Sequence, residues 1–162
     1  MECDTGIAYL VSGVNDWRIR RIMQVWDLSD PAKPVHIRGF SLPNHQPGSR
    51  GGRFGAHASN ENQPPMYAKR ILFFSWFNAG VRAVDIRDPY RPREIGYYMP
   101  AVTGKTDQRC VKTAEGLRCK VEIQTNNVEA DDRGFIYIVD RANTGMHVLE
   151  RTGAARGVAD FK

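Results

Sequence analysis

The sequence predicts an all-β protein built from repeated antiparallel units, and three observations carry that prediction. A turn motif, VWDLSDPAKP at residues 25–34, returns fifty-eight positions later as AVDIRDPYRP at residues 83–92. Two longer segments, ILFFSWFNAGVRAVD at 71–85 and IYIVDRANTGMHVLE at 136–150, align without a gap at an offset of 65. Each has β-branched and aromatic runs on both sides of a turn signal, which is the pattern of a β-hairpin.

A third and looser copy of this hairpin opens the chain. IAYLVS at residues 7–12 and RIMQVWDLS at residues 21–29 flank a longer turn that contains Gly13, Asn15 and Asp16. We therefore expect three hairpins in chain order.

The recurring Asp-x-x-Asp-Pro-x-x-Pro motif predicts a corner that leads a hairpin into one more strand. Asp30 and Asp88 can accept a hydrogen bond from their own backbone two residues on, and the prolines that follow preset φ for a tight turn. The second proline of each motif is tolerated only where a strand starts or lies at an edge. Residues 35–43 and 93–101 are therefore predicted to be outermost strands.

Polar extended stretches precede the later hairpins and are predicted to be innermost strands. They are GAHASNENQ at 55–63 and EIQTNNVEADD at 122–132. Four strands per unit, with a crossover from the outer edge back to the centre, are the plan of a β-propeller blade. The sequence thus predicts a partial β-propeller of about two and a half to three four-stranded blades.

We expect residues 1–162 to form a single propeller segment with three blades and two loop insertions. The blades span about 1–43, 54–101 and 121–162, and the insertions span 44–53 and 102–120. The first blade lacks an inner strand and the third lacks a fourth strand, whereas a closed ring needs at least about four blades. We therefore expect this chain to be the C-terminal part of a larger ring, completed by residues outside it or by other chains.

Several of these segments resemble a known family. The matching stretches are YLV at 9–11, VWDLSDP at 25–31, GVRAVDIRDP at 80–89 and YIVD at 137–140. Together they are similar to the LVIVD-repeat family of bacterial β-propellers. The resemblance implies a propeller architecture and an exported or cell-surface protein, and it implies no particular reaction.

Three cysteines leave one over after pairing. Cys110 and Cys119 bracket the polar loop VKTAEGLR, which suits a local disulfide; closing about ten residues would contribute roughly 2 to 3 kcal/mol. Such a bond would indicate an extracellular, periplasmic or cell-surface location. The alternative is a pair of reduced thiols in a cytosolic loop, and metal binding is disfavoured because neither cysteine has a CxxC partner. Cys3 is then free or paired outside this chain.

The composition is that of a globular protein, with 41% hydrophobic and 25% charged residues. No apolar run approaches the ~20 residues that span a bilayer, and the first residues show no signal-peptide pattern. The net charge of +5 comes from arginines spread thinly along the chain, apart from a cluster at 18–21. We therefore do not expect nucleic acid as a partner. The expected partners are other propeller blades, because the predicted first and third blades are incomplete.

The candidate site lies on the predicted inner strands, because inner strands line the central channel of a propeller. The candidate ligand-binding residues at the channel mouth are His57, Asn60, Glu61, Asn126 and Asn127, with Asn62 and Gln124 beside them. The alternative is that these side chains only satisfy inner-strand backbone and channel water.

A metal ion is the one cofactor that the sequence leaves open. His57 and Glu61 could bind it, and this stretch is similar to propellers of the selenium-binding protein and methanethiol oxidase family, which have metal-binding histidines near the channel. The resemblance implies a second histidine where this chain has Asn60, and that departure weighs against a metal site.

Other residues that attract attention are predicted to be structural. His36, His45 and His147 lack a carboxylate at a readable spacing, and Trp26, Trp76 and the FFSWF run at 73–77 are expected in the core between blades. Two classes of function remain. One is a non-catalytic module that binds a protein or ligand, and the other is a metal-dependent, oxidoreductase-like or hydrolytic propeller enzyme with its site at the channel.

Overall fold

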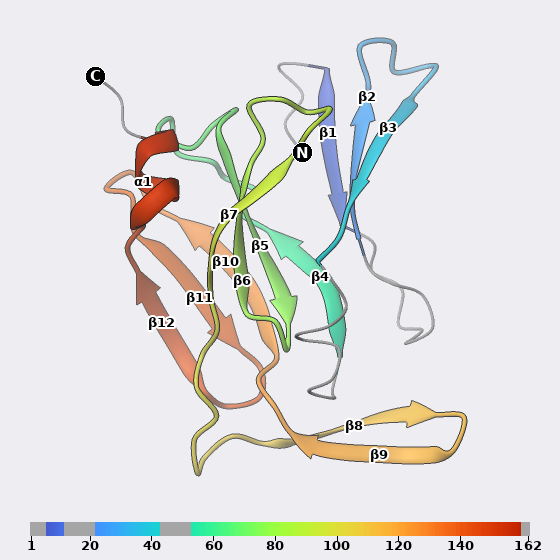
Figure 1. Ribbon diagram of the computed structural model, residues 1–162, viewed down its shortest axis with the longest axis vertical. Coiled ribbons are helices and arrows are strands. Elements are labelled where there is room, and N and C mark those ends of the chain that lie inside the picture. Colours follow the sequence, from blue (N-terminus) through green and yellow to red (C-terminus); the bar gives the residue numbers. More distant parts are fainter. Residues whose placement is uncertain (1–5, 12–21, 43–52, 160–162) are drawn as a thin grey trace.

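The computed structural model describes residues 6–11, 22–42 and 53–159, and these residues form an all-β structure with one short helix (Figure 1). We group most of the strands into three units, numbered in chain order. Unit 1 contains β1 (Ile7–Val11), β2 (Met23–Asp27) and β3 (Val35–Phe40). Unit 2 contains β4 (Phe54–Ser59), β5 (Ile71–Phe77), β6 (Val81–Asp85) and β7 (Arg93–Tyr98). Unit 3 contains β10 (Thr125–Ala130), β11 (Ile136–Asp140) and β12 (Gly145–Leu149).

The strand pairing confirms the three predicted hairpins, β1–β2, β5–β6 and β11–β12, all of them antiparallel. The predicted outer strands β3 and β7 pair with β2 and β6, and the predicted inner strands β4 and β10 pair with β5 and β11. The corners have the expected chemistry. Asp30 accepts a hydrogen bond from the backbone nitrogen of Ala32 at 3.1 Å, and Asp88 accepts one from Tyr90 at 3.0 Å.

Units 2 and 3 differ from the expected separate blades, because they belong to one curled sheet. The strand order in this seven-stranded sheet is β12-β11-β10-β5-β6-β7, with β4 paired to β5 off that path. The junction between β10 and β5 is a single bridge between Thr125 and Phe77. Unit 1 forms its own three-stranded sheet.

The gapless alignment of the two later hairpins is wrong by one residue in the first strand. Leu72 pairs with Val84, and Ile136 pairs with Leu149. The second strands of the hairpins lie 65 positions apart, so the first strands lie 64 apart. The reason is that the turn of unit 3 holds one residue more than the turn of unit 2.

Two hydrophobic cores lie on opposite faces of unit 2. Leu72, Phe74 and Val84 pack with Met23 and Val25 of unit 1. On the other face, side chains of unit 2 pack with side chains of unit 3: Ile71, Phe73, Val81 and Ala83 with Val128, Ile136 and Ile138. Every residue of β5 is buried because the strand is covered on both faces, and this explains its unbroken apolar sequence.

The expectation for the aromatic residues is confirmed for β5 and wrong for Trp26. Trp76 is fully buried in the core between units 1 and 2. Trp26 is only half-buried, and its ring packs against the exposed His36 at 4.9 Å between ring centroids. It lies on the face of β2 opposite Val25, away from the core.

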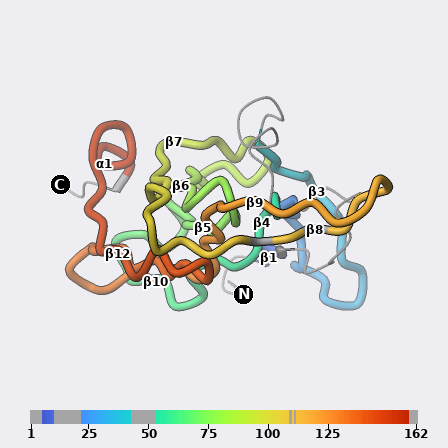
Figure 2. Tube along the Cα trace, turned by 90° about the horizontal axis from the view of Figure 1, so that it is seen from below, coloured from blue at the N-terminus to red at the C-terminus, as the bar shows by residue number. Residues whose placement is uncertain are grey.

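The predicted loop insertion at 102–120 contains a hairpin, β8 (Gln108–Thr113) and β9 (Gly116–Val121). Cys110 and Cys119 face each other across it and form the predicted disulfide. Figures 1 and 2 show this hairpin reaching away from the cores, toward the side of the molecule that holds unit 1. After unit 3, helix α1 (Gly153–Ala159) packs against β7. Apart from Arg53, the insertion at 44–53 lies outside the described residues, as do Cys3 and His45.

Candidate functional site

The inner strands β4 and β10 meet through a hydrogen bond that joins two of the predicted site residues. His57 Nδ1 lies 2.9 Å from the carbonyl oxygen of Asn126. The same carbonyl accepts a second hydrogen bond from Ser75 Oγ at 2.5 Å. The ring of His57 also packs edge-on against Phe77, with 4.6 Å between centroids. His57 and Asn126, from segments far apart in the sequence, therefore share one polar surface, which we call the inner wall.

Asn60 has a structural role at the end of β4. Its side chain is 1% exposed, and its Oδ1 accepts a hydrogen bond from the backbone nitrogen of Phe73 at 2.9 Å. Its own backbone nitrogen donates to the carbonyl of Phe73 at 3.2 Å. Asn60 thus continues the β4–β5 pairing through its side chain. It is the predicted site residue least able to contact a ligand.

The remaining predicted residues are more exposed than Asn60. Glu61 and Asn127 are exposed, and Asn126 is half-buried with its Nδ2 donating to Asn127 Oδ1. Glu61 lies close enough to Glu129 for its negative charge to disfavour the ionised form of the Glu129 carboxyl. Burial raises the pKa of Glu129, and the carboxylate of Glu61 raises it further.

The hydrogen bond of His57 fixes which ring nitrogen carries a proton. A carbonyl oxygen can only accept, so Nδ1 of His57 donates to Asn126 and Nε2 of the neutral ring holds the lone pair. Metal-binding histidines are commonly oriented in this way. Within residues 6–11, 22–42 and 53–159, however, no three His, Cys, Asp or Glu side chains come together as a possible metal site. In the described part of the chain, no third His, Cys, Asp or Glu therefore joins His57 and Glu61 in such a group.

Asp140 organises the start of β10, a role that the sequence did not predict. Its carboxylate is buried and accepts hydrogen bonds from the backbone nitrogens of Gln124 and Ala142, both at 2.7 Å. Gln124 is itself fully buried, and its Nε2 donates to the carbonyl of Ile123 at 2.8 Å. The signal in the sequence was an Asp directly before a turn, at the end of the YIVD stretch. Asp27 and Asp85 likewise stand directly before the corners of units 1 and 2 and accept hydrogen bonds from the backbone two residues on.

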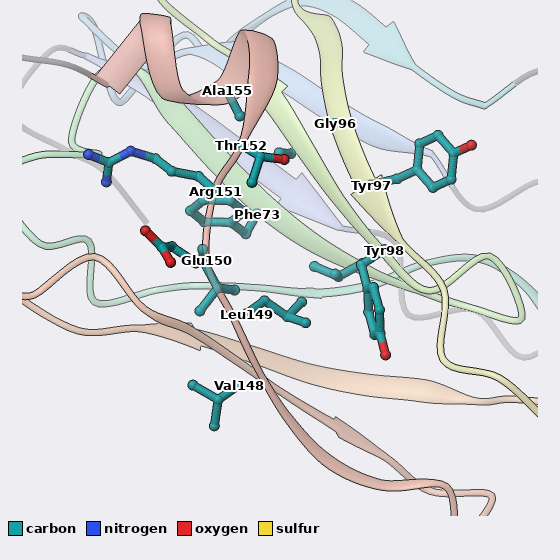
Figure 3. A pocket seen from close by; sticks show the side chains of 13 residues that line it. Phe73, Gly96, Tyr97, Tyr98, Val148, Leu149, Glu150, Arg151, Thr152 and Ala155 are labelled. Carbon is teal, nitrogen blue, oxygen red and sulfur yellow. The ribbon is translucent and has the colours of Figure 1, made fainter.

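A pocket of about 350 Å³, which the sequence did not predict, lies between units 2 and 3. Figure 3 shows side chains of β7, β12 and the segment that leads into α1 around it. Phe73, Leu149 and Tyr98 supply apolar wall, and Arg151 borders it. Arg151 donates to the hydroxyl of Tyr67 at 3.0 Å. The pocket is large enough for a small ligand but is mostly apolar.

His36 and His147, which are predicted to be structural, make contacts elsewhere in the fold. His147 Nδ1 lies 3.3 Å from the hydroxyl of Tyr98 on the neighbouring unit, and His36 packs on Trp26.

No family model matches the chain, and no curated protein matches it. In the described residues, no helix has the length and apolar character needed to cross a bilayer.

Proposed function

We propose that this chain is a non-catalytic LVIVD-repeat β-propeller module, exported or at the cell surface, that binds a protein or small ligand as part of a larger ring. The observation that carries the proposal is the hydrogen bond between His57 and Asn126, because it brings the polar inner strands of two successive units side by side. Polar groups from neighbouring inner strands are what the channel of a propeller presents to a ligand. Asn126, Asn127 and Glu61 offer donors and acceptors there.

The outer edge of unit 3 supports the idea of a larger ring. In units 1 and 2 an outer strand pairs with the second strand of the hairpin: β3 pairs with β2, and β7 pairs with β6. Among the described residues no strand pairs with the outer edge of β12. The apolar pocket between β7 and β12 includes Val148 and Leu149 of this strand in its lining.

The disulfide supports an oxidising compartment. Both cysteines lie on a hairpin whose described side chains are almost all exposed, so a soluble reductant would have access to the bond. An exposed disulfide of this kind persists in an oxidising compartment. Thiol labelling of protein from its native source tests this point. Cys110 and Cys119 should both resist labelling until a reductant is added, and two free thiols would overturn the exported assignment.

The binding proposal can be tested by mapping where ligands perturb the protein. The isotope-labelled 162-residue chain is titrated with a library of small polar metabolites and short peptides, and amide shifts are recorded. We expect shifts at Ala58, Asn126 and Asn127, and their loss in Asn127→Ala. Lys112→Ala, an exposed change on the β8–β9 hairpin, is the matched control. Ligands that perturb only the pocket between units 2 and 3 would show that the inner wall is not the site.

A metal-dependent enzyme is the second candidate, and the orientation of His57 is what favours it. Metal content of the natively purified chain separates the two candidates. The binding module predicts less than about a tenth of a metal ion per chain. One tightly bound ion that is lost in His57→Ala and kept in the control His36→Ala would establish the metal site instead.

A further inference from the structure

The same kind of apolar interface joins unit 1 to unit 2 and unit 2 to unit 3. Units 1 and 3, at the two ends of the described fold, each carry one further half of such an interface. Units 1 and 2 meet through Tyr9, Met23 and Val25 on one side and Leu72, Phe74 and Val84 on the other. Units 2 and 3 meet through the equivalent positions one unit along. There, Phe73, Val81 and Ala83 pack toward Ile136, Ile138 and Leu149.

Strand register establishes these equivalences. Tyr9 pairs with Val25, Phe73 with Ala83, and Tyr137 with Val148. All three pairs occupy the same place in their hairpins, with the first strands 64 positions apart. Met23, Val81 and Met146 likewise occupy one shared position in the second strand.

Unit 3 therefore presents on its outer side the same three residue types that unit 1 buries against unit 2. We call Tyr137, Met146 and Val148 the docking face. Met23 and Val25 are fully buried, whereas Met146 is 64% exposed and Val148 is 53% exposed. In unit 2, Val81 at the same position is 4% exposed. Two of the three side chains of this face are thus half to two-thirds exposed, and Tyr137 beside them is partly buried. Clustered exposed apolar side chains of this kind mark interaction sites.

Unit 1 presents the other half of the interface. Ala8, Leu10 and Trp26 correspond to Leu72, Phe74 and Val84, the side chains of unit 2 that receive unit 1. We call these three residues of unit 1 the receiving face. Ala8 is buried, as Leu72 is at the same position. Leu10 is 40% exposed and Trp26 is half-buried, although Phe74 and Val84 at the same positions are fully buried. Figure 2 shows units 1 and 3 at opposite sides of the molecule.

We propose that the docking face of one chain packs on the receiving face of a second copy of the same chain, and that two copies close a ring. This proposal rests on the propeller architecture proposed above. A head-to-tail contact closes only if the rotation per unit permits it. Two copies supply six units, within the range of about four to eight blades found in propellers, whereas three copies would exceed it. Each copy then buries both faces, and no face is left for a third.

The test is the native mass of the full chain, by light scattering across a concentration series, with a complementation step. The wild-type chain should reach twice its 18.3 kDa mass. Met146→Glu on the docking face and Leu10→Glu on the receiving face should each stay at the monomer mass. An equimolar mixture of the two variants should recover a dimer, because one of its two interfaces joins a wild-type docking face to a wild-type receiving face. Leu117→Glu, at a 71% exposed position on the β8–β9 hairpin, is the control and should dimerise as wild type does.

Each other result overturns the proposal. A wild-type chain that stays at 18.3 kDa rules out self-association. A Leu10→Glu variant that still dimerises indicates a contact between two docking faces, and a series of larger particles indicates an open chain. Met146→Leu, which keeps the apolar side chain, should remain dimeric and guards against a folding defect at that position. The ligand-shift experiment on the inner wall is independent of mass, so a monomer that still binds there would leave the proposed function standing.

Discussion

The turns of the two later hairpins provide the sharpest test of the fold, because the same glycine position is crowded in one and open in the other. Gly80 and Gly145 are 65 positions apart and both have positive φ, +76° and +101°. An added Cβ at Gly80 would lie 2.1 Å from the carbonyl oxygen of Tyr98 and 2.9 Å from Met99 Cα. At Gly145 no heavy atom beyond the chain neighbours lies within 4 Å of that Cβ.

The predicted losses follow from these two environments. Gly145→Ala carries only the cost of a left-handed backbone for a residue with a side chain, about 1 to 2 kcal/mol. Gly80→Ala carries the same cost and also a backbone collision, for which overpacking is worth about 1 to 3 kcal/mol more. We therefore expect Gly80→Ala to lower the free energy of unfolding by about 2 to 5 kcal/mol.

Urea unfolding followed by tryptophan fluorescence measures both variants. Samples should share one protein concentration, because self-association would make stability depend on concentration. The slope of free energy against urea should match wild type in both variants, so that a shift in midpoint reports stability. Equal losses for Gly80→Ala and Gly145→Ala would refute the close approach of the β5–β6 turn to β7.

Three further predictions concern single sites. Replacing Cys110 and Cys119 with Ser should remove about 2 to 3 kcal/mol of local stability and speed amide exchange in the β8–β9 hairpin only; faster exchange in β5 would contradict this. Burial raises the pKa of Asp131, but hydrogen bonds from Arg133, Phe135 and Tyr137 outweigh it and lower that pKa from 3.8 to about 2. Asp131 therefore stabilises the fold above its unfolded pKa, and this contribution is lost as the pH falls toward about 2. Asp131→Asn should flatten the stability curve between about pH 4 and 2, and an unchanged acid slope would contradict it. Asn60→Ala should cost about 1 to 3 kcal/mol by leaving a buried backbone donor unpaired, whereas a loss below about 0.5 kcal/mol would contradict its structural role.

The hairpins and corners could be predicted from sequence because their determinants are local. Asp30 and Asp88 make the expected turn contacts with their own backbone. The β8–β9 hairpin could not be predicted in the same way, because nearly all its described side chains are exposed and no apolar face marks its strands. Its pairing is held by backbone hydrogen bonds and by the disulfide.

The candidate site was predicted in composition but not in detail. Residues His57 and Asn126 do come together, yet nothing local in the sequence shows that a backbone carbonyl is the acceptor. The inward side chain of Asn60 depends on an irregularity in β4, where the pairing shifts register between Phe54 and Ala58. Such a bulge changes which of the following residues point inward. The polar sequence of this stretch has no alternating hydrophobicity, so the bulge could not be predicted from it.

One residue in a turn decides which face of unit 3 is available for assembly. With a gapless offset of 65, Ile136 and Ile138 would correspond to Ile71 and Phe73, and they would point away from unit 2. The extra residue in the turn shifts the first strand by one, so Ile136 and Ile138 are buried against unit 2, and Tyr137 and Val139 face outward. Side chains alternate along a strand, so a one-residue shift exchanges its two faces. Only with the observed register does Tyr137 join Met146 and Val148 on one surface, matching Tyr9, Met23 and Val25. The proposed assembly therefore follows from strand pairing that sequence periodicity could not resolve.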